Sequence, residues 1–209
     1  MKVLAHGIRL LFLAAFVLLI INGKVMVWLA LYVLSLLVAP IFGRVYCGYV
    51  CPMNTAMIPA HWLSRKLKWQ ATHAPKGLKN GILPWIFLLV SMALMLVFKR
   101  VLQINFPILP LWLVLSVLVT LRYKPAVFHN LLCPFGAPQK LFARFSLLKK
   151  SVDHAACIGC KRCEVVCPSD AIVVAADDRK AVITPALCHQ CTSCRDICPT
   201  QAIRYSKNR

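Results

Sequence analysis

Acidic residues are absent from the first 150 positions of this sequence. The 209 residues include 25 Lys and Arg but six Asp and Glu, and all six acids follow residue 150. Residues 1–150 carry 17 basic side chains, whereas residues 151–209 carry eight basic and six acidic ones. The absence excludes a proton relay of Asp or Glu in the first part. It also predicts two domains, a transmembrane domain at 1–150 and a second domain at 151–209.

Several cofactor motifs are missing as well. The chain has no Cys-x-x-Cys-His sequence for a c-type haem and no pair of mid-membrane histidines for a b-type haem. It has no glycine-rich phosphate or dinucleotide loop, so there is no flavin motif. We therefore expect neither haem nor flavin, and we expect no nucleic-acid partner.

Long apolar runs fill the first part of the chain. The sequence is 60% hydrophobic, against about 45–50% in an average soluble domain. Four runs have roughly the 17–25 residues that cross a bilayer as a helix, and they lie at residues 3–21, 25–42, 82–98 and 104–121. Because no period-two alternation is present, these runs predict four transmembrane helices and not a barrel.

The basic residues predict how these helices are oriented. With the N-terminus in the cytoplasm, fourteen basic residues of the first part fall on the cytoplasmic side and three on the far side. Short cytoplasmic loops are enriched in Lys and Arg. We therefore expect a multi-pass protein of the inner cell membrane, with both termini and the C-terminal domain in the cytoplasm.

A weak internal repeat runs through the first part. A helical hairpin leads to Cys51-Pro52 and a basic amphipathic stretch at residues 57–70, and a second leads to Cys133-Pro134 and a similar stretch at 137–150. Both stretches predict helices in the cytoplasmic headgroup layer. The alternative is a solvated basic loop, because short periodicities are weak signals.

Eight of the eleven cysteines form two copies of one motif near the C-terminus. Residues 157–168 read CIGCKRCEVVCP and residues 188–199 read CHQCTSCRDICP, an offset of 31. In this bacterial ferredoxin run, three cysteines bind one [4Fe–4S] cluster and the fourth binds the other. Zinc sites use paired Cys-x₂-Cys units instead. We predict one cluster on Cys157, Cys160, Cys163 and Cys198, and a second on Cys188, Cys191, Cys194 and Cys167.

The fold class follows from both parts. The sequence predicts an α-helical membrane protein with four transmembrane helices, followed by a small α+β domain of the bacterial dicluster ferredoxin type. Residues 172–174 and 182–184 are expected to form the small hairpin of that domain.

Residues 43–54, which read GRVYCGYVCPMN, precede the cysteine-rich end, and together these features resemble the NapH-like polyferredoxin family over the whole chain. Members have four membrane helices, two Cys-x₃-Cys-Pro motifs and a C-terminal pair of [4Fe–4S] clusters. Relatives include regulators of nitrous-oxide respiration and copper reductases of oxidase assembly. The second motif departs from the pattern, because His129 stands where the first cysteine belongs.

A third metal or cluster site is a further hypothesis. Cys47, Cys51, His129 and Cys133 form a chemically sensible ligand set if the two Cys-Pro turns face one another. Each of Cys51 and Cys133 precedes a helix-opening proline, where the positive helix end favours a thiolate. The alternative is that the cysteines pack as small apolar residues and His129 caps the fourth helix.

The resemblance implies an electron-transfer subunit of a quinol-linked oxidoreductase complex. Its partners are then the lipid bilayer, quinone or quinol, and a redox partner protein or complex. Two alternatives remain open. One is an accessory or maturation protein, such as a metal-ion reductase or redox sensor for another respiratory complex. The other is an anchor for an enzyme with its own cofactors.

Overall fold

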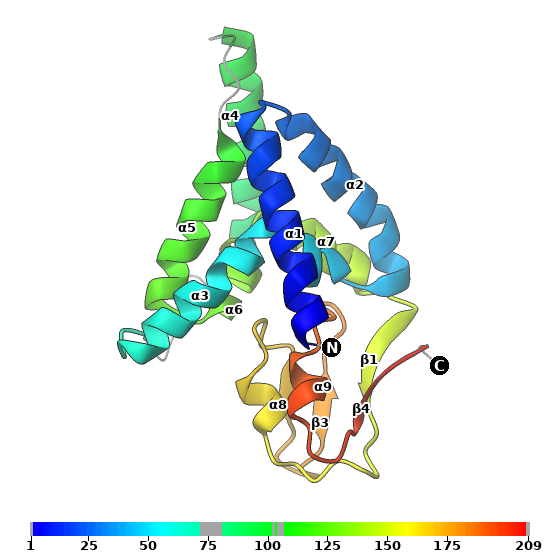
Figure 1. The fold of residues 1–209 in the computed structure, drawn as a ribbon. Helices are drawn as coiled ribbons and strands as arrows, with labels where there is room; N and C mark the ends of the chain where they lie inside the picture. Colours follow the sequence, from blue (N-terminus) through cyan, green and yellow to red (C-terminus); the bar gives the residue numbers. More distant parts are fainter. Residues whose placement is uncertain (1, 72–80, 102, 104–106, 208–209) are drawn as a thin grey trace. The chain divides into compact units, whose positions relative to one another are not determined.

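The computed structural model describes residues 2–71, 81–101, 103 and 107–207. The chain divides into two compact units. One unit combines Met1–Pro52 with Gln139–Arg209, and the other is Met53–Pro138. The elements are labelled in Figure 1.

The first unit begins with a hairpin of two apolar helices, α1 (Lys2–Ile21) and α2 (Val25–Phe42). Both are long and apolar enough to span a bilayer. Gly23 takes a φ of 69° in the connecting turn, a conformation that glycine adopts readily. The rings of Phe16 and Trp28 meet edge to face at 5.0 Å and join the two helices.

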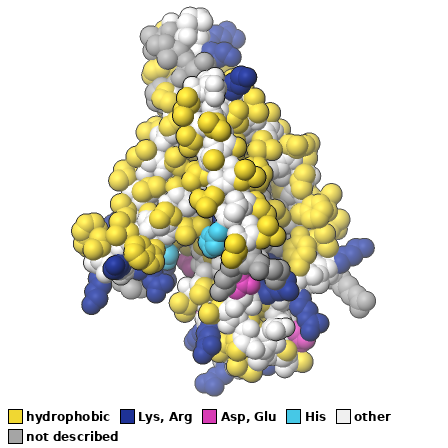
Figure 2. All heavy atoms as spheres, in the orientation of Figure 1, with side chains coloured by type: hydrophobic (Ala, Val, Ile, Leu, Met, Phe, Trp, Pro, Cys, Tyr) yellow, Lys and Arg dark blue, Asp and Glu magenta, His cyan; other side chains and the backbone are white. Residues whose placement is uncertain are grey.

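Most other large apolar side chains of this hairpin are exposed, as Figure 2 illustrates on the face it draws. Leu11 is 68% exposed and Leu37 69%. Apolar surface of this extent is unfavourable in water and is suited to lipid. This property supports the expected membrane location of the hairpin.

A π-helical turn, η1 (Tyr46–Val50), follows α2 and leads into helix α3 (Pro52–Lys66). The Cys51 backbone N–H donates to the carbonyl of Tyr46 at 2.8 Å and closes the wide turn. Pro52 then opens α3, a position where its missing N–H costs nothing.

The second unit contains most of α3 and the helices α4 (Leu83–Val101), α5 (Ile108–Arg122) and α6 (Pro125–Val127). A second π-helical turn, η3 (Phe128–Leu132), ends this series before Cys133.

The spans of the second unit confirm the sequence prediction in part. Helix α4 is long and apolar enough to cross a bilayer. Helix α5 has 15 described residues and falls short of the expected span at 104–121, of which residues 104–106 lie outside the described part. Within the described residues, three helices therefore meet the length of a membrane span and a fourth apolar helix is shorter.

The C-terminal part of the first unit contains two small antiparallel sheets. Strand β1 (Leu148–Val152) pairs with β4 (Ile203–Lys207), and β2 (Ile172–Val174) pairs with β3 (Ala181–Ile183). The β2–β3 pair confirms the predicted hairpin, with its second strand one residue earlier than expected. Two short helices, α8 (Arg162–Val165) and α9 (Ser193–Ile197), carry cysteines of the two motifs.

The prediction of an amphipathic helix at residues 137–150 is wrong for the second half of that stretch. Helix α7 (Gly136–Ala143) ends early, and β1 begins at Leu148. Residues 148–152 form a strand because they pair with the five residues of β4, from Leu148 opposite Lys207 to Val152 opposite Ile203. Strand β1 therefore runs through residue 150, where the sequence predicted a domain boundary. That boundary stays a prediction.

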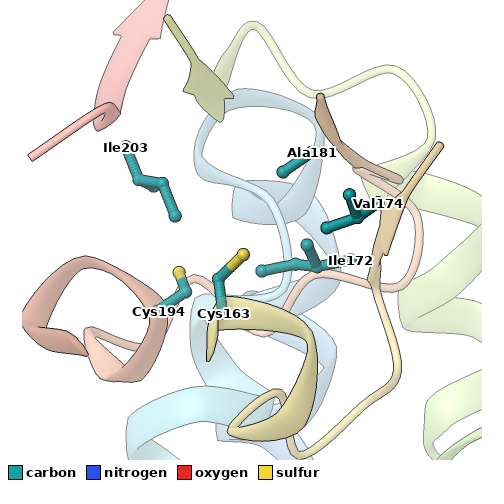
Figure 3. Packing of buried hydrophobic residues seen from close by; sticks show 6 residues of the cluster. All are labelled: Cys163, Ile172, Val174, Ala181, Cys194 and Ile203. Carbon is teal, nitrogen blue, oxygen red and sulfur yellow. The ribbon is translucent and has the colours of Figure 1, made fainter. Parts of the chain in front are cut away.

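The core of the cysteine-rich part combines aliphatic side chains with two cysteines. Figure 3 shows Cys163 of α8 and Cys194 of α9 beside the strand residues. The cluster consists of Cys163, Ile172, Val174, Ala181, Cys194 and Ile203. The apolar helices followed by this small two-sheet part confirm the predicted fold class.

Candidate iron-sulfur site

Four cysteines line one cavity in the cysteine-rich part, and we call them the outer set. They are Cys157, Cys160, Cys163 and Cys198. The first three come from one motif, whereas the fourth comes from the end of the other motif. Cys167, which ends the first motif, is not among the lining residues. This arrangement is the one expected for crossed ligation, in which each motif lends its last cysteine to the other cluster.

The remaining four cysteines of the two motifs form the inner set, and they are Cys188, Cys191, Cys194 and Cys167. Burial raises the pKa of Cys188 to about 11, and the neighbouring sulfurs of Cys191 and Cys167 add to the rise. Burial likewise raises the pKa of Cys194 to about 12, again with a contribution from Cys167. Cys167 therefore lies within electrostatic reach of the second motif, as crossed ligation requires.

These pKa values describe the sulfurs without metal. Neutral thiols are favoured there, because a buried thiolate without a counter-charge is costly. Bound iron would supply that positive charge, and metal binding would release the protons. Each set consists of four cysteines. Four thiolate donors are the ligands that an iron-sulfur cluster requires.

The last cysteine of each motif, Cys167 or Cys198, accepts a different set of hydrogen bonds at its sulfur. The Ala171 backbone N–H donates to Cys167 Sγ at 3.2 Å. Partial burial raises the pKa of Cys198, but hydrogen bonds from the Thr200 hydroxyl and from nearby backbone N–H groups lower it below its usual value. Such bonds stabilise negative charge on sulfur and are one of the means by which proteins set cluster potentials.

A cluster and a single metal ion require different spacings of the cysteine sulfurs. Within the described residues, no three His, Cys, Asp or Glu side chains are close enough together to bind one ion. In a [4Fe–4S] cluster each cysteine binds a different iron atom, so the four sulfurs stand farther apart than around one ion. The lack of such a close group among the described residues therefore does not count against a cluster.

The two sets differ in exposure. Cys160 of the outer set is exposed, and Ile158 beside it is 64% exposed. In the inner set Cys188, Cys191 and Cys194 are all buried. The outer set therefore lies near the protein surface, whereas three of the four inner cysteines are shielded from solvent.

The inner set lies against the π-helical turn η1. A Cβ atom at Gly48 would collide with the backbone carbonyl of His189. The Tyr49 hydroxyl donates to the Gln190 carbonyl at 3.4 Å, and the Arg44 guanidinium donates to the Ala186 carbonyl at 3.4 Å. The segment just before and within the inner motif is therefore fixed to the turn that follows α2.

Arg9 reinforces this turn from helix α1. Its Nε donates to the Gly48 carbonyl at 2.9 Å, and its guanidinium lies 5.5 Å from the centre of the Tyr49 ring. Neither Arg9 nor Gly48 is part of a motif that points to this contact. Glycine at position 48 was the available signal, because close backbone approach is a common reason for glycine.

The two Cys-Pro turns share one backbone geometry. Cys51 has φ −64° and ψ 118°, and Cys133 has φ −65° and ψ 114°. Each cysteine N–H donates at 2.8 Å to the carbonyl five residues earlier. Cys47 and His129 occupy the same position in their turns, and both are buried. The sequence repeat is therefore a structural repeat, and π-turns of this kind are frequent at functional sites.

His129 lies inside η3 and does not cap α5. Its Nε2 lies 3.2 Å from Asn54 Oδ1, so one ring nitrogen already has a side-chain neighbour. The site expected from Cys47, Cys51, His129 and Cys133 stays a prediction, because each compact unit contributes two of its members.

Known protein families match both the repeated first part and the cysteine-rich end of the chain. A family model described as a 4Fe-4S binding domain matches residues 25–70 and again 105–152. A model described as a 4Fe-4S dicluster domain matches residues 156–202. The ferredoxin-type protein NapH of Haemophilus influenzae is 34% identical over 151 residues. The chain belongs to the NapH-like polyferredoxin family. Both its repeated first part and its cysteine-rich end are thus similar to 4Fe-4S domain families.

Other family relatives match over similar lengths. The NapH alignment covers 65% of this chain and 51% of the relative. The methylamine utilization ferredoxin-type protein MauN of Paracoccus denitrificans is 29% identical, over 64% of this chain and 51% of the relative. An uncharacterized protein of Methanocaldococcus jannaschii is 26% identical, over 71% and 61%. The chain thus spans about half to three-fifths of these relatives, and no solved structure matches it.

The close approach at Gly48 generates a prediction about the inner motif. Gly48→Ala should push η1 away from the His189 carbonyl and loosen residues 186–191. We expect hydrogen exchange of that segment to accelerate at least about fivefold, which corresponds to about 1 kcal/mol. Gly7→Ala is the matched control, because a Cβ at Gly7 meets nothing within 4 Å. Equal exchange in the two variants would contradict the proposed fixation.

Proposed function

We propose that this chain passes electrons between membrane quinol and a redox partner protein through two [4Fe–4S] clusters. The outer set holds one cluster and the inner set the other. One observation carries the proposal, namely that Cys198 lines the cavity of the first motif while Cys167 lies near the sulfurs of the second. When bound, each cluster takes up and releases one electron at a time, and crossed ligands keep the two centres close.

Burial suggests the order of the two sites along the electron path. The inner set adjoins η1, which follows the apolar helix α2, so it is the site nearer the membrane hairpin of its own unit. The outer set includes the exposed Cys160 and lies beside exposed apolar residues such as Ile158 and Val165. We infer that quinol exchanges electrons with the inner set and that the partner protein docks near the outer set.

A second candidate function is an accessory or maturation protein that reduces a metal ion for another respiratory complex. The observation that favours it is the burial of Cys47 and Cys51 in and after the π-helical turn η1. Neither cysteine is needed by the two proposed clusters. Metal-ion reduction would use them, whereas transfer between quinol and a protein partner would not require them.

The crossed assignment predicts which cluster each cysteine serves. Replacing Cys167 with Ser should disturb the signal of the cluster on Cys188, Cys191 and Cys194, and leave the other intact. Electron paramagnetic resonance of the purified, reduced protein checks this, with Cys160→Ser as the matched variant for the outer set. Damage by Cys167→Ser to the cluster of its own motif would show that ligation is not crossed.

Metal analysis checks the number of clusters. Two four-iron clusters predict about eight iron atoms per chain. A value well above eight that falls to eight in the Cys51→Ser variant would support the further site at Cys47, Cys51, His129 and Cys133. About four iron atoms per chain in fully loaded protein would contradict the proposed pair.

The orientation generates a prediction for reporter fusions. A reporter fused after Arg209 should be active as a cytoplasmic fusion, and one inserted at Asn22 or Val101 as an extracytoplasmic fusion. The reason is the excess of basic residues on the proposed cytoplasmic side. Alkaline phosphatase and green fluorescent protein fusions measure this directly. An exported C-terminus would overturn the orientation and the proposed cytoplasmic location of the cysteine-rich part.

The proposed path predicts an asymmetric effect of removing one cluster. In membrane vesicles, Cys191→Ser should slow reduction of the outer cluster by quinol at least about tenfold, because the nearer site is damaged. Cys160→Ser should leave reduction of the inner cluster by quinol intact. Stopped-flow absorbance follows both. Clusters that never respond to quinol in the unmodified protein would favour the accessory function.

A further inference from the structure

Lys150 is a buried lysine in strand β1. It is 7% exposed, whereas its strand neighbours Lys149 and Ser151 are both partly exposed. Its ammonium group donates a hydrogen bond to the backbone carbonyl of Cys191. The strand therefore delivers a positive charge to the loop that carries the inner cysteines.

Among the described residues no carboxylate neutralises this charge, and the Lys150 ammonium donates its hydrogen bond to the Cys191 carbonyl. The cavity beside Lys150 is also lined by Arg195 and Arg204, and its lining contains no Asp or Glu. Burying an ammonium without an opposite charge is costly. An anion is therefore expected near Lys150.

The inner cysteines lie within electrostatic reach of Lys150. Burial raises the pKa of both Cys188 and Cys194, and in each case the positive charge of Lys150 opposes the rise. A [4Fe–4S] cluster with four thiolate ligands has a net negative charge, which grows by one unit on reduction. The proposed inner cluster is thus the anion that this arrangement lacks.

The outer set has a weaker counterpart. The Lys180 ammonium donates to the Cys157 carbonyl at 2.6 Å. Lys180 is only partly buried, however, and water and salt screen a charge at such a position. The two sets therefore differ in the strength of the positive field that acts on them.

We propose that the Lys150 ammonium is the counter-charge of the inner cluster and raises its reduction potential. The physical reason is that a fixed, desolvated cation stabilises the more negative, reduced state more than the oxidised one. Burial alone would act in the opposite direction, because a low dielectric disfavours the added electron. Lys150 thereby keeps a shielded cluster reducible. This inference rests on the proposed cluster at the inner set.

The test compares three variants by redox titration with electron paramagnetic resonance. Lys150→Met removes the charge and retains an unbranched side chain. We expect the inner cluster to become harder to reduce by at least tenfold in its equilibrium constant, which is about 59 mV for one electron. Lys150→Arg keeps the positive charge and should therefore have a potential close to that of the unmodified protein. Lys149→Met, one residue away on the partly exposed side of the strand, should change the potential by less than a third as much.

Each outcome decides the matter. An unshifted inner potential in Lys150→Met, or an equal shift in Lys150→Arg, would overturn the proposal. If Lys150→Met loses about half of the iron and Lys150→Arg retains it, the charge is needed to hold the cluster, which supports the proposal. Loss of iron in both variants would show that the contact is steric and that the proposal is wrong.

The unmodified protein separates this inference from the proposed function. Its titration is recorded first, and a protein without two clusters contradicts the proposed function. Two clusters whose potentials ignore Lys150 contradict this inference alone.

Discussion

The close approach of two backbone segments at Gly48 ties the inner motif to the hairpin of α1 and α2. The carbonyl of His189 occupies the space that any side chain at position 48 would fill. Arg9 of α1 donates a hydrogen bond to the Gly48 carbonyl of the same turn. Hydrogen bonds from Arg44 to the Ala186 carbonyl, from Tyr49 to the Gln190 carbonyl and from Tyr205 to the Phe42 carbonyl add to this contact. The order of the two proposed clusters depends on it.

Charge is the second constraint, and it acts on residues 1–150. A chain without acids in its first 150 residues cannot neutralise buried cations there with local carboxylates. Arg44 is completely buried, and its Nε and one terminal nitrogen have no hydrogen-bond partner among the described residues. Lys150 is buried in the same way beside the inner cysteines. Positive charge of this kind is costly in a protein interior, and proposed anionic clusters nearby offset the cost.

Much of this molecule could be predicted from local sequence. The offset of 31 between the cysteine motifs, the hairpin at Ile172–Val174 and the helices α1, α2 and α4 all follow from short-range patterns. The repeat of Cys51-Pro52 and Cys133-Pro134 also appears in the structure, as two matching π-helical turns. These features depend on residues that are close in the sequence, so a local sequence pattern is enough to predict them.

The features that could not be predicted from the sequence depend on contacts with residues far away in the chain. Strand β1 looked like part of a basic amphipathic helix, because its pairing with β4 involves residues about 55 positions later. For the same reason Lys150 looked like a solvated lysine, and nothing near it in sequence indicates burial beside Cys191. Gly48 gave a weak signal, since a single glycine does not say which backbone approaches it.

The two proposed [4Fe–4S] clusters are expected to lie close together, because each is completed by a cysteine of the other motif. Electron paramagnetic resonance of the fully reduced protein tests this most directly. We expect the two reduced clusters to interact magnetically, so that the spectrum broadens when the second cluster takes up its electron. Two signals that add without any interaction, or a single cluster signal at full iron loading, would contradict it.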